Sequence, residues 1–350
     1  VIESDSESYK SITIKQEAPK IPAGSSELRP HRAAVGLYDL KDGQLLRRKS
    51  VELDITGDLT QVKELSGEKL ADLVLINDHD LTYAKIRFDA RSIATLKAHL
   101  GKLDDGLSRA LCWSAAWDMF RDAELSATDF IEIALTGLAG EDDITTVTAL
   151  MSQLNTAVEI YASDKNRDSL REKVAGALLS LLKSAKAGSD HQLQFARSFA
   201  ALAHSKEQGA EIRNILDGKF QDLKIDADLR WHLILCLVER GLSTRAEIDA
   251  ELKGDNTLTG GLSHERCIAA FPTLEAKEAA FNKATEDESI TNWSRLSAIQ
   301  GYNRPIQRHL HEGFVDRYFD LILETYNTKS YEVSTSIIDL LYPSYLISTQ

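Results

Sequence analysis

Residues Ile76–Asp122 read INDHDLTYAKIRFDARSIATLKAHLGKLDDGLSRALCWSAAWDMFRD, and the spacing of the apolar side chains changes within this stretch. Over Leu81–Asp89 side chains of different character alternate, which predicts a β-strand with both faces largely covered. From Ser92 onward apolar residues recur every three or four positions, which predicts helix. Asp89 and Ser92 can cap the first helix, because a short side-chain oxygen accepts a hydrogen bond from a free N–H group. The stretch therefore predicts a β part that is followed by an α part.

Upstream of this stretch, short alternating segments between turn residues predict five strands: Tyr9–Gln16, Arg32–Leu40, Gln44–Ile55, Thr60–Leu65 and Asp72–Ile76. Asp42-Gly43 gives the sharpest hairpin signal, because both residue types tolerate the positive φ of a tight turn. The polar start, Val1–Glu7, is expected to be loose, and Ala18–Pro30, with three prolines, is expected to be a loop. Together these segments predict a small β-sandwich domain over residues 1–90.

Residues 91–350 are expected to form a separate helical domain, with roughly fourteen helices joined by short connections. Capping-box patterns begin at Ser126, Ser205 and Thr244, and in each the fourth residue can satisfy a backbone N–H group in return. Glycines that suit helix ends recur at Gly140, Gly188, Gly218, Gly241 and Gly254. The predicted fold class is a small all-β sandwich followed by a larger all-α, HEAT-like helical-repeat domain (an α-solenoid).

Composition restricts the classes of partner. The net charge of the 350 residues is −13, and no basic run of the kind that follows phosphates occurs, so nucleic acid and anionic membranes are not expected partners. No apolar run reaches the ~18 residues of a membrane span, and no signal peptide is recognised. The three cysteines, Cys112, Cys236 and Cys267, lie far apart, which favours buried reduced thiols in a cytoplasmic protein.

Several separate runs resemble one known family. They are ITIKQEAP from Ile12, RPHRAAVGLYDL from Arg29, NDHDLTYAKIRFD from Asn77, LCWSAAWDMFRDAEL from Leu111, DADLRWHLILCLVERG from Asp226 and FPTLEAKEAAFNKA from Phe271. In this order they are similar to the C-terminal, non-catalytic part of bacterial zinc aminopeptidases, the gluzincin enzymes related to aminopeptidase N and puromycin-sensitive aminopeptidase. The resemblance extends from about Ser11 to about Pro343.

The resemblance implies a role that supports catalysis carried out elsewhere. The parent enzyme would remove N-terminal residues from peptides, with zinc in a catalytic domain that this sequence does not include. This chain would supply a β spacer and a helical cap that closes the peptide-substrate chamber. Its expected partners are therefore the catalytic domain of the same parent chain and peptide substrates.

No residue in this segment is expected to be catalytic or to bind a metal. The zinc motif of the family is H-E-x-x-H, which places two histidine ligands one helical turn apart. His264-Glu265 is followed by Ile268 where the second ligand belongs, and His311-Glu312 is followed by Val315. The segment alone is therefore predicted to be inactive and to hold no cofactor.

The candidate substrate-binding residues are Tyr302, Arg304 and Arg308. The carboxylate at the C-terminus of a peptide suits a guanidinium group, which can donate two parallel hydrogen bonds. Arg304 and Arg308 are spaced one helical turn apart, with Pro305 at an expected helix start and Tyr302 nearby. The alternative is that both arginines are solvated on a surface helix. Arg230 beside Trp231 is a second candidate, with packing between helices as its alternative.

A second class of function also fits the sequence. A free-standing α-solenoid can act as a scaffold that binds other proteins and has no enzymatic partner. The two hypotheses differ in what the gene encodes before Val1. An H-E-x-x-H helix upstream supports the aminopeptidase, and a start codon just before Val1 supports the scaffold.

Overall fold

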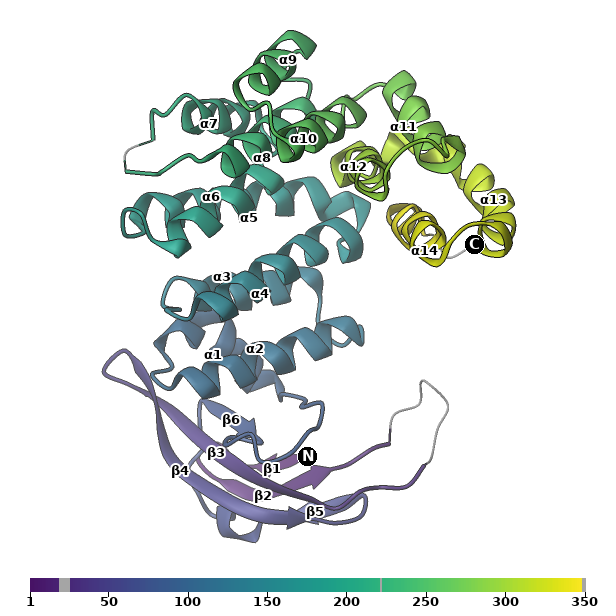
Figure 1. Cartoon of the computed structure of the whole chain (residues 1–350). Coiled ribbons are helices and arrows are strands. Elements are labelled where there is room, and N and C mark those ends of the chain that lie inside the picture. The colour runs from purple at the N-terminus through teal and green to yellow at the C-terminus, as the bar shows by residue number, and fades with distance from the viewer. Residues whose placement is uncertain (19–25, 221, 348–350) are drawn as a thin grey trace. The chain divides into compact units, whose positions relative to one another are not determined.

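The computed structural model describes residues 1–18, 26–220 and 222–347, and the chain forms two compact units, Val1–Ala157 and Val158–Gln350 (Figure 1). In its described residues the first unit contains six strands and four α-helices. The strands are β1 (Ile2–Ser4), β2 (Tyr9–Lys15), β3 (His31–Lys41), β4 (Gln44–Ile55), β5 (Leu59–Gln61) and β6 (Leu73–Ile76). The helices are α1 (Ala90–His99), α2 (Gly106–Arg121), α3 (Ala127–Leu138) and α4 (Ile144–Thr156).

The six strands form two antiparallel sheets of three strands, with the orders β1-β2-β5 and β4-β3-β6. Asp42 and Gly43, with φ of 51° and 79°, connect β3 to β4, and the pair Lys41 and Gln44 closes the ladder. The predicted hairpin is therefore confirmed. Apolar side chains of both sheets, among them Ile12 of β2 and Val35 of β3, share one buried core. This shared core makes the two sheets a small β-sandwich, as the alternating segments predict.

Two predictions near the N-terminus are wrong. Val1–Glu7 is not loose throughout, because Ile2 pairs with Ile12 across β1 and β2 and packs against the core of the sandwich. The strand predicted over Thr60–Leu65 is short, since β5 ends at Gln61 and Lys63–Leu65 forms a 3₁₀ turn, η1. Part of the loop predicted over Ala18–Pro30 lies outside the described residues.

The strand predicted over Leu81–Asp89 is also wrong, because the chain leaves the sheet directly after β6. Asn77 and Asp80 have φ of 63° and 53°, and the Asn77 side chain closes this turn through two hydrogen bonds to the backbone of Thr82, of 2.8 and 3.1 Å. Beyond the turn Lys85 pairs with Asp122, next to the end of α2, at 2.9 Å. Side-chain contacts with a helix thus replace a strand ladder. The helix start is confirmed, since Asp89 accepts hydrogen bonds from two N–H groups of α1.

Asp78, in the polar segment directly after β6, is the centre of a buried hydrogen-bond network. Its fully buried carboxylate accepts hydrogen bonds from the Tyr38 hydroxyl of β3 and, at 2.9 Å, from Arg47 of β4. The Tyr38 hydroxyl also lies 2.8 Å from the Ser108 hydroxyl of α2. A Cβ on Gly36 would lie 2.6 Å from the Asp78 carboxylate, so only glycine leaves room there. This network ties one sheet to α2 inside the first unit.

The second unit is helical in its described residues. Its α-helices are α5 (Asp164–Ser184), α6 (Asp190–Leu202), α7 (Lys206–Leu216), α8 (Ala227–Val238), α9 (Arg245–Gly254), α10 (Leu258–Ala269), α11 (Leu274–Glu286), α12 (Asn292–Tyr302), α13 (Val315–Thr328) and α14 (Tyr331–Leu340). Shorter turns are the π-helix η3 (Ala157–Tyr161) and the 3₁₀ helices η4 (Pro305–Leu310), η5 (Glu312–Phe314) and η6 (Ser344–Leu346). Consecutive helices pack in pairs, such as α5 on α6 and α11 on α12 (Figure 1). The described residues thus contain fourteen α-helices in all, as expected.

Local capping signals predict where these helices begin. Ser126, Ser205 and Thr244 each accept a hydrogen bond from the N–H group three residues on, and the last two form complete capping boxes. Gly218 and Gly241, just beyond the ends of α7 and α8, adopt positive φ, as expected for glycine stops. Gly188 also has positive φ but lies in the connection directly before α6, and Gly140 and Gly254 do not have positive φ.

The change from strands to helices lies between β6 and α1, whereas the compact units divide after Ala157. Helices α1 to α4 thus belong to the same compact unit as the sheets. The division into domains at residues 90 and 91 remains a prediction.

Candidate functional site

The three residues predicted to contact substrate lie at the end of α12 and just beyond it. Tyr302 is the last residue of α12, Arg304 precedes η4, and Arg308 lies within η4. Pro305 occupies the first position of η4, where its missing N–H group would be unpaired in any case. The helix start at Pro305 is therefore confirmed, but the helix is of the 3₁₀ type and Gln307 departs from helical geometry. Arg304 and Arg308 do not share a regular α-helical turn.

Arg304 contacts a carboxylate that is almost completely buried. Its Nε donates a hydrogen bond to Oε2 of Glu239, whose side chain is 2% exposed. Glu239 follows α8, and its other carboxylate oxygen accepts a hydrogen bond from Arg240. Arg240 also donates to three backbone carbonyl groups. One buried carboxylate therefore faces two guanidinium groups.

Arg308 contacts a second buried carboxylate. Its Nη2 lies 3.1 Å from Oε2 of Glu159 and donates to the Glu159 carbonyl at 2.9 Å. Glu159 lies in η3, and its two carboxylate oxygens accept hydrogen bonds of 2.7 and 2.6 Å from Arg171 of α5. A fork of two parallel bonds is the strong arrangement for this pair of groups. Glu159 is thus held by Arg171, and Arg308 binds a carboxylate that already has a partner.

We call these six residues the arginine cluster: Glu159, Arg171, Glu239, Arg240, Arg304 and Arg308. Four guanidinium groups face two buried carboxylates, so the cluster has two more positive than negative charges. Asp168 also pairs with Arg171, but its side chain is 68% exposed, so water screens its charge. Unbalanced charge in a protein interior costs free energy. The arginine cluster is therefore the best candidate in the described residues for binding an anion.

The pKa shifts in the cluster follow from this charge balance. Burial alone would raise the pKa of Glu239, but the guanidinium groups of Arg304 and Arg240 outweigh it and hold that pKa below its usual value. Burial opposes the charge of Arg304, and Glu239 outweighs it and raises the Arg304 pKa. The pKa of Arg308 is lowered, first by burial and then by the nearby charge of Arg167. Arg308 is therefore the cation that an added anion would stabilise most.

The Tyr302 ring does not face the arginine cluster. It is buried, stacks on the His311 ring with a centroid distance of 4.5 Å, and meets the Phe314 ring edge-on at 5.5 Å. Its carbonyl oxygen accepts the Arg304 N–H group at 2.9 Å. The structure thus brings Arg304 and Arg308 to one cluster and turns the Tyr302 side chain into the core. A substrate contact of Tyr302 remains a prediction.

Lys277 fixes the segment that carries Arg304. This lysine of α11 is completely buried, and its Nζ donates to the carbonyls of Ala269, Gly301 and Tyr302 at 3.0, 3.1 and 3.0 Å. These carbonyls lie at the ends of α10 and α12, where no helical N–H group satisfies them. Burial, followed by the charge of Arg304, lowers the pKa of Lys277 to about 7. The ammonium group replaces the missing helical hydrogen bonds at two helix ends.

His311 gives this region a dependence on pH. Its Nε2 lies 2.9 Å from the Tyr302 carbonyl, and burial, with the charge of Lys277, lowers its pKa from 6.5 to about 4. Between these pH values the unfolded chain binds a proton that the folded chain does not. Stability is therefore lost as pH falls from 6.5 toward 4. His309 and Arg308 also face this ring and oppose its protonation.

Replacing His311 with glutamine is expected to reduce the loss of stability between pH 6.5 and pH 4. The free energy of unfolding of the wild type should fall by about 2 kcal/mol more than that of the variant between pH 6.5 and pH 4. The measurement is urea unfolding at a series of pH values. His99→Gln, in the last turn of α1, is the control and should keep the slope of the wild type. Equal slopes for wild type and His311→Gln would contradict the assignment.

Sequence reasoning missed Glu159, Glu239 and Lys277. Lys277 leaves the clearest local signal, because it shares one face of α11 with Ala280, Phe281 and Ala284, at spacings of three, four and seven residues. A lysine in a stripe of core residues indicates a buried amine with fixed acceptors. Glu239 follows a helix that is buried on nearly all sides, which is a weaker signal of the same kind.

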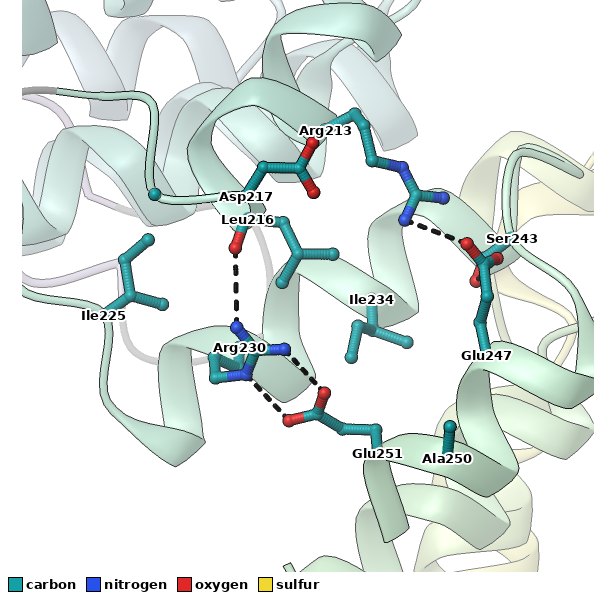
Figure 2. Close-up of a pocket in the computed structure, with 11 residues that line it drawn as sticks. Arg213, Leu216, Asp217, Ile225, Arg230, Ile234, Ser243, Glu247, Ala250 and Glu251 are labelled. Atoms are coloured by element: carbon teal, nitrogen blue, oxygen red, sulfur yellow. Dashed lines mark hydrogen bonds and ion pairs between the residues drawn. The ribbon is translucent and has the colours of Figure 1, made fainter. Parts of the chain in front are cut away.

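Arg230, the second candidate, lines a surface pocket of about 570 Å³ between α7, α8 and α9 (Figure 2). Its guanidinium donates to both carboxylate oxygens of Glu251, at 2.7 and 2.6 Å. Trp231 instead donates its indole N–H to Asp255 at 2.8 Å. Arg230 therefore fits the alternative, a role in packing between helices, better than the role of a cation that is free to bind substrate.

The charges in this pocket are balanced in pairs. Figure 2 shows Arg213 directed at Glu247 and Arg230 at Glu251, with Ile234 between the two pairs. Asp217 adds a further negative charge to the lining. A second pocket, of about 440 Å³, includes Glu265 and no cation. Neither of these two pockets offers the surplus of positive charge that the arginine cluster has.

Two further findings concern what the described residues do not contain. No group of three or more histidine, cysteine, aspartate or glutamate side chains is arranged to hold a metal ion in residues 1–18, 26–220 and 222–347. Over the same residues, none of the helices has both the length and the apolar composition that crossing a bilayer requires.

Comparison with known proteins identifies the family. The family model for the ERAP1-like C-terminal domain matches residues 73–350. Aminopeptidase N of Streptomyces lividans is 39% identical over 354 residues, in a match that covers 99% of this chain and 41% of that relative. The chain thus spans less than half the length of the relative. It belongs to the family of the ERAP1-like C-terminal domain and corresponds to the C-terminal part of an enzyme similar to aminopeptidase N.

Proposed function

We propose that this chain is the non-catalytic C-terminal portion of a cytoplasmic zinc metallo-aminopeptidase. Residues 1–90 would form a β spacer and residues 91–350 a HEAT-like helical cap that closes the peptide-substrate chamber. Zinc would lie in the catalytic domain of the same parent chain and supply the hydrolytic chemistry that releases N-terminal residues. Membership of the family and the interrupted motifs at His264 and His311 support this division of labour.

The observation that carries the proposed peptide site is the positive surplus of the arginine cluster. A peptide C-terminal carboxylate would bring one negative charge to a place with two uncompensated positive charges. Both Nη atoms of Arg304, and Nη1 of Arg308, have no hydrogen-bond partner among the described residues. Tyr302 would serve the site through its carbonyl, which holds the Arg304 backbone.

The side chains of Arg304 and Arg308 are 20% and 17% exposed. A carboxylate would therefore bind at the partly exposed side of the cluster and not in the core. It would gain charge-assisted hydrogen bonds and leave Glu239 and Glu159 with their inner partners, Arg240 and Arg171. The cluster thus suits reversible binding of one anionic chain end.

Substitution in the complete enzyme tests this site. Arg304→Ala and Arg308→Ala, singly and together, are expected to raise KM about tenfold for peptides long enough to reach the cluster, because each removes charge-assisted hydrogen bonds. The kcat of these peptides should not change, since the reacting bond is remote. KM for aminoacyl anilides, which have no distant carboxylate, should stay as in the wild type.

A matched control separates binding from folding. Arg230→Ala removes another guanidinium that is paired with a carboxylate, but in the balanced pocket, and is expected to leave all KM values unchanged. The same series of peptides with C-terminal amides should lose the effect of Arg304→Ala and Arg308→Ala. Unchanged KM values for every peptide acid in the double variant would rule out a carboxylate site at the cluster.

One observation favours the second class of function, a scaffold that binds other proteins. Phe319, Leu323 and Tyr326 lie at spacings of four and three residues on α13, and all three are exposed. An exposed apolar stripe of this kind suits contact with another protein surface. The genomic reading frame discriminates the two, because an H-E-x-x-H motif encoded in frame upstream would support the aminopeptidase.

A further inference from the structure

The arginine cluster is in contact with a segment from the end of the described chain. The 3₁₀ helix η6 packs against η4, the element that carries Arg308. The Tyr345 ring of η6 lies 5.7 Å from Cζ of Arg308, within the range of a cation–π contact. The side chain of Asn303, next to Arg304, donates to the Leu340 carbonyl at 2.8 Å, which holds the end of α14 nearby. The segment after α14 therefore lies against the residues of the candidate site.

Tyr345 interacts with both halves of the cluster. The charges of Arg304 and Arg308, and those of Glu159 and Glu239, all act on its hydroxyl group, whose pKa is raised, chiefly by burial. The hydroxyl is thus neutral across the physiological range. It therefore occupies space near the guanidinium groups without removing their surplus charge.

We propose that Tyr345 covers the arginine cluster, so that a peptide C-terminal carboxylate must displace its ring to bind. The inference rests on the proposed function of the cluster as a carboxylate site. Tyr345 then sets the affinity of that site for peptides, because every bound carboxylate competes with the ring for Arg308.

The geometry makes this cover removable. The helix η6 has three residues, and none of them is fully buried. Ile347, which follows it, is exposed. The backbone hydrogen bonds of Ser344 and Leu346 close within the segment, to Tyr342 and Pro343 at 2.7 and 2.9 Å. The segment can therefore move as a unit without breaking a helix or a sheet.

A charged carboxylate can displace the Tyr345 ring from Arg308. Its hydrogen bonds to guanidinium are charge-assisted and roughly twice as strong as those between neutral groups. The phenol ring offers Arg308 only its π face. Removing the ring should therefore increase the affinity for the carboxylate, whereas removing a residue that helps to bind peptide would decrease it.

Binding of two blocked peptides to the 350-residue chain tests the proposal. One is an N-acetylated hexapeptide with a free C-terminal carboxylate, and the other is the same peptide with a C-terminal amide. By isothermal titration calorimetry, Tyr345→Ala is expected to bind the acid about fivefold more tightly than the wild type does, with no change for the amide. Tyr345→Phe keeps the ring and should behave as the wild type. Tyr331→Ala, at a position 81% exposed on α14, is the matched control.

The outcomes separate the cover from the site beneath it. Equal or weaker binding of the acid by Tyr345→Ala would overturn the cover, while preference of the wild type for the acid over the amide would still support the carboxylate site. If neither wild type nor Tyr345→Ala distinguishes acid from amide, the proposed site and its cover both fail. Circular dichroism of each variant shows whether it is folded before it is titrated.

Discussion

Replacing Glu239 with glutamine is expected to lower the free energy of unfolding by about 4 kcal/mol, as for other buried ion pairs that lose one partner. Glutamine keeps the size of the side chain and removes its charge. Arg304 and Arg240 would then have no carboxylate in contact, although Arg240 keeps its carbonyl acceptors. Urea unfolding at pH 7, followed by circular dichroism, measures the loss.

Two further variants show whether the charge is the cause. Glu288→Gln removes a carboxylate that is 79% exposed and paired with Lys329, so it should leave the midpoint of urea unfolding almost unchanged. Adding Arg304→Met to Glu239→Gln should restore part of the loss, because it removes one of the uncompensated charges. A loss of under about 1 kcal/mol for Glu239→Gln would contradict the buried network.

Replacing Gly301 with alanine is expected to lower the free energy of unfolding by about 3 kcal/mol or more, the upper range for overpacking. Gly301 lies where α12 crosses α10, and a Cβ there would lie 2.1 Å from the Arg266 carbonyl oxygen and 2.6 Å from the Ala269 Cβ. That carbonyl accepts the Ala270 N–H group at the end of α10, so it cannot move aside without losing a hydrogen bond. The helices would have to separate instead. Thermal unfolding followed by circular dichroism measures the effect.

Gly261→Ala is the matched control for this crossing. Gly261 lies on α10 as well, but nothing lies within 4 Å of a Cβ added there. Alanine should stabilise the chain by roughly 0.5–1 kcal/mol, since it is the better helix former. Opposite signs for the two substitutions would confirm that the tight approach, and not glycine content, decides the result. A stability of Gly301→Ala equal to that of the wild type would refute the contact.

Turns and helix caps could be predicted from the sequence, because the interactions that form them involve only a few neighbouring residues. Asp42-Gly43 turns the chain by itself, and Ser205 and Gln208 cap α7 through their own side chains. Leu81–Asp89 shows where this logic fails: its alternation fits a strand, but a strand also needs a neighbour, and the turn at Asn77 leads the segment away from the sheet.

The partners of the candidate residues could not be predicted for the same reason. Arg304 binds Glu239, 65 positions earlier, and Arg308 binds Glu159, 149 positions earlier. The spacing within one segment could identify the two arginines as candidates. It contains no information on which carboxylates from other helices they contact. Tyr302 shows the limit most clearly, because its place beside the arginines in sequence does not reveal that its ring faces the core.

The carboxylate of Glu159, which contacts both Arg171 and Arg308, also restricts which substitutions this chain can accept during evolution. Glu159 lies 12 positions from Arg171 and 149 positions from Arg308 in the sequence. Its loss would nevertheless remove the buried carboxylate that both arginines contact. Replacement of Glu159 alone is therefore disfavoured, whereas Arg308 can be replaced while the fork to Arg171 remains. Relatives that lack Glu159 should therefore also have uncharged residues of similar bulk in place of Arg171 and Arg308.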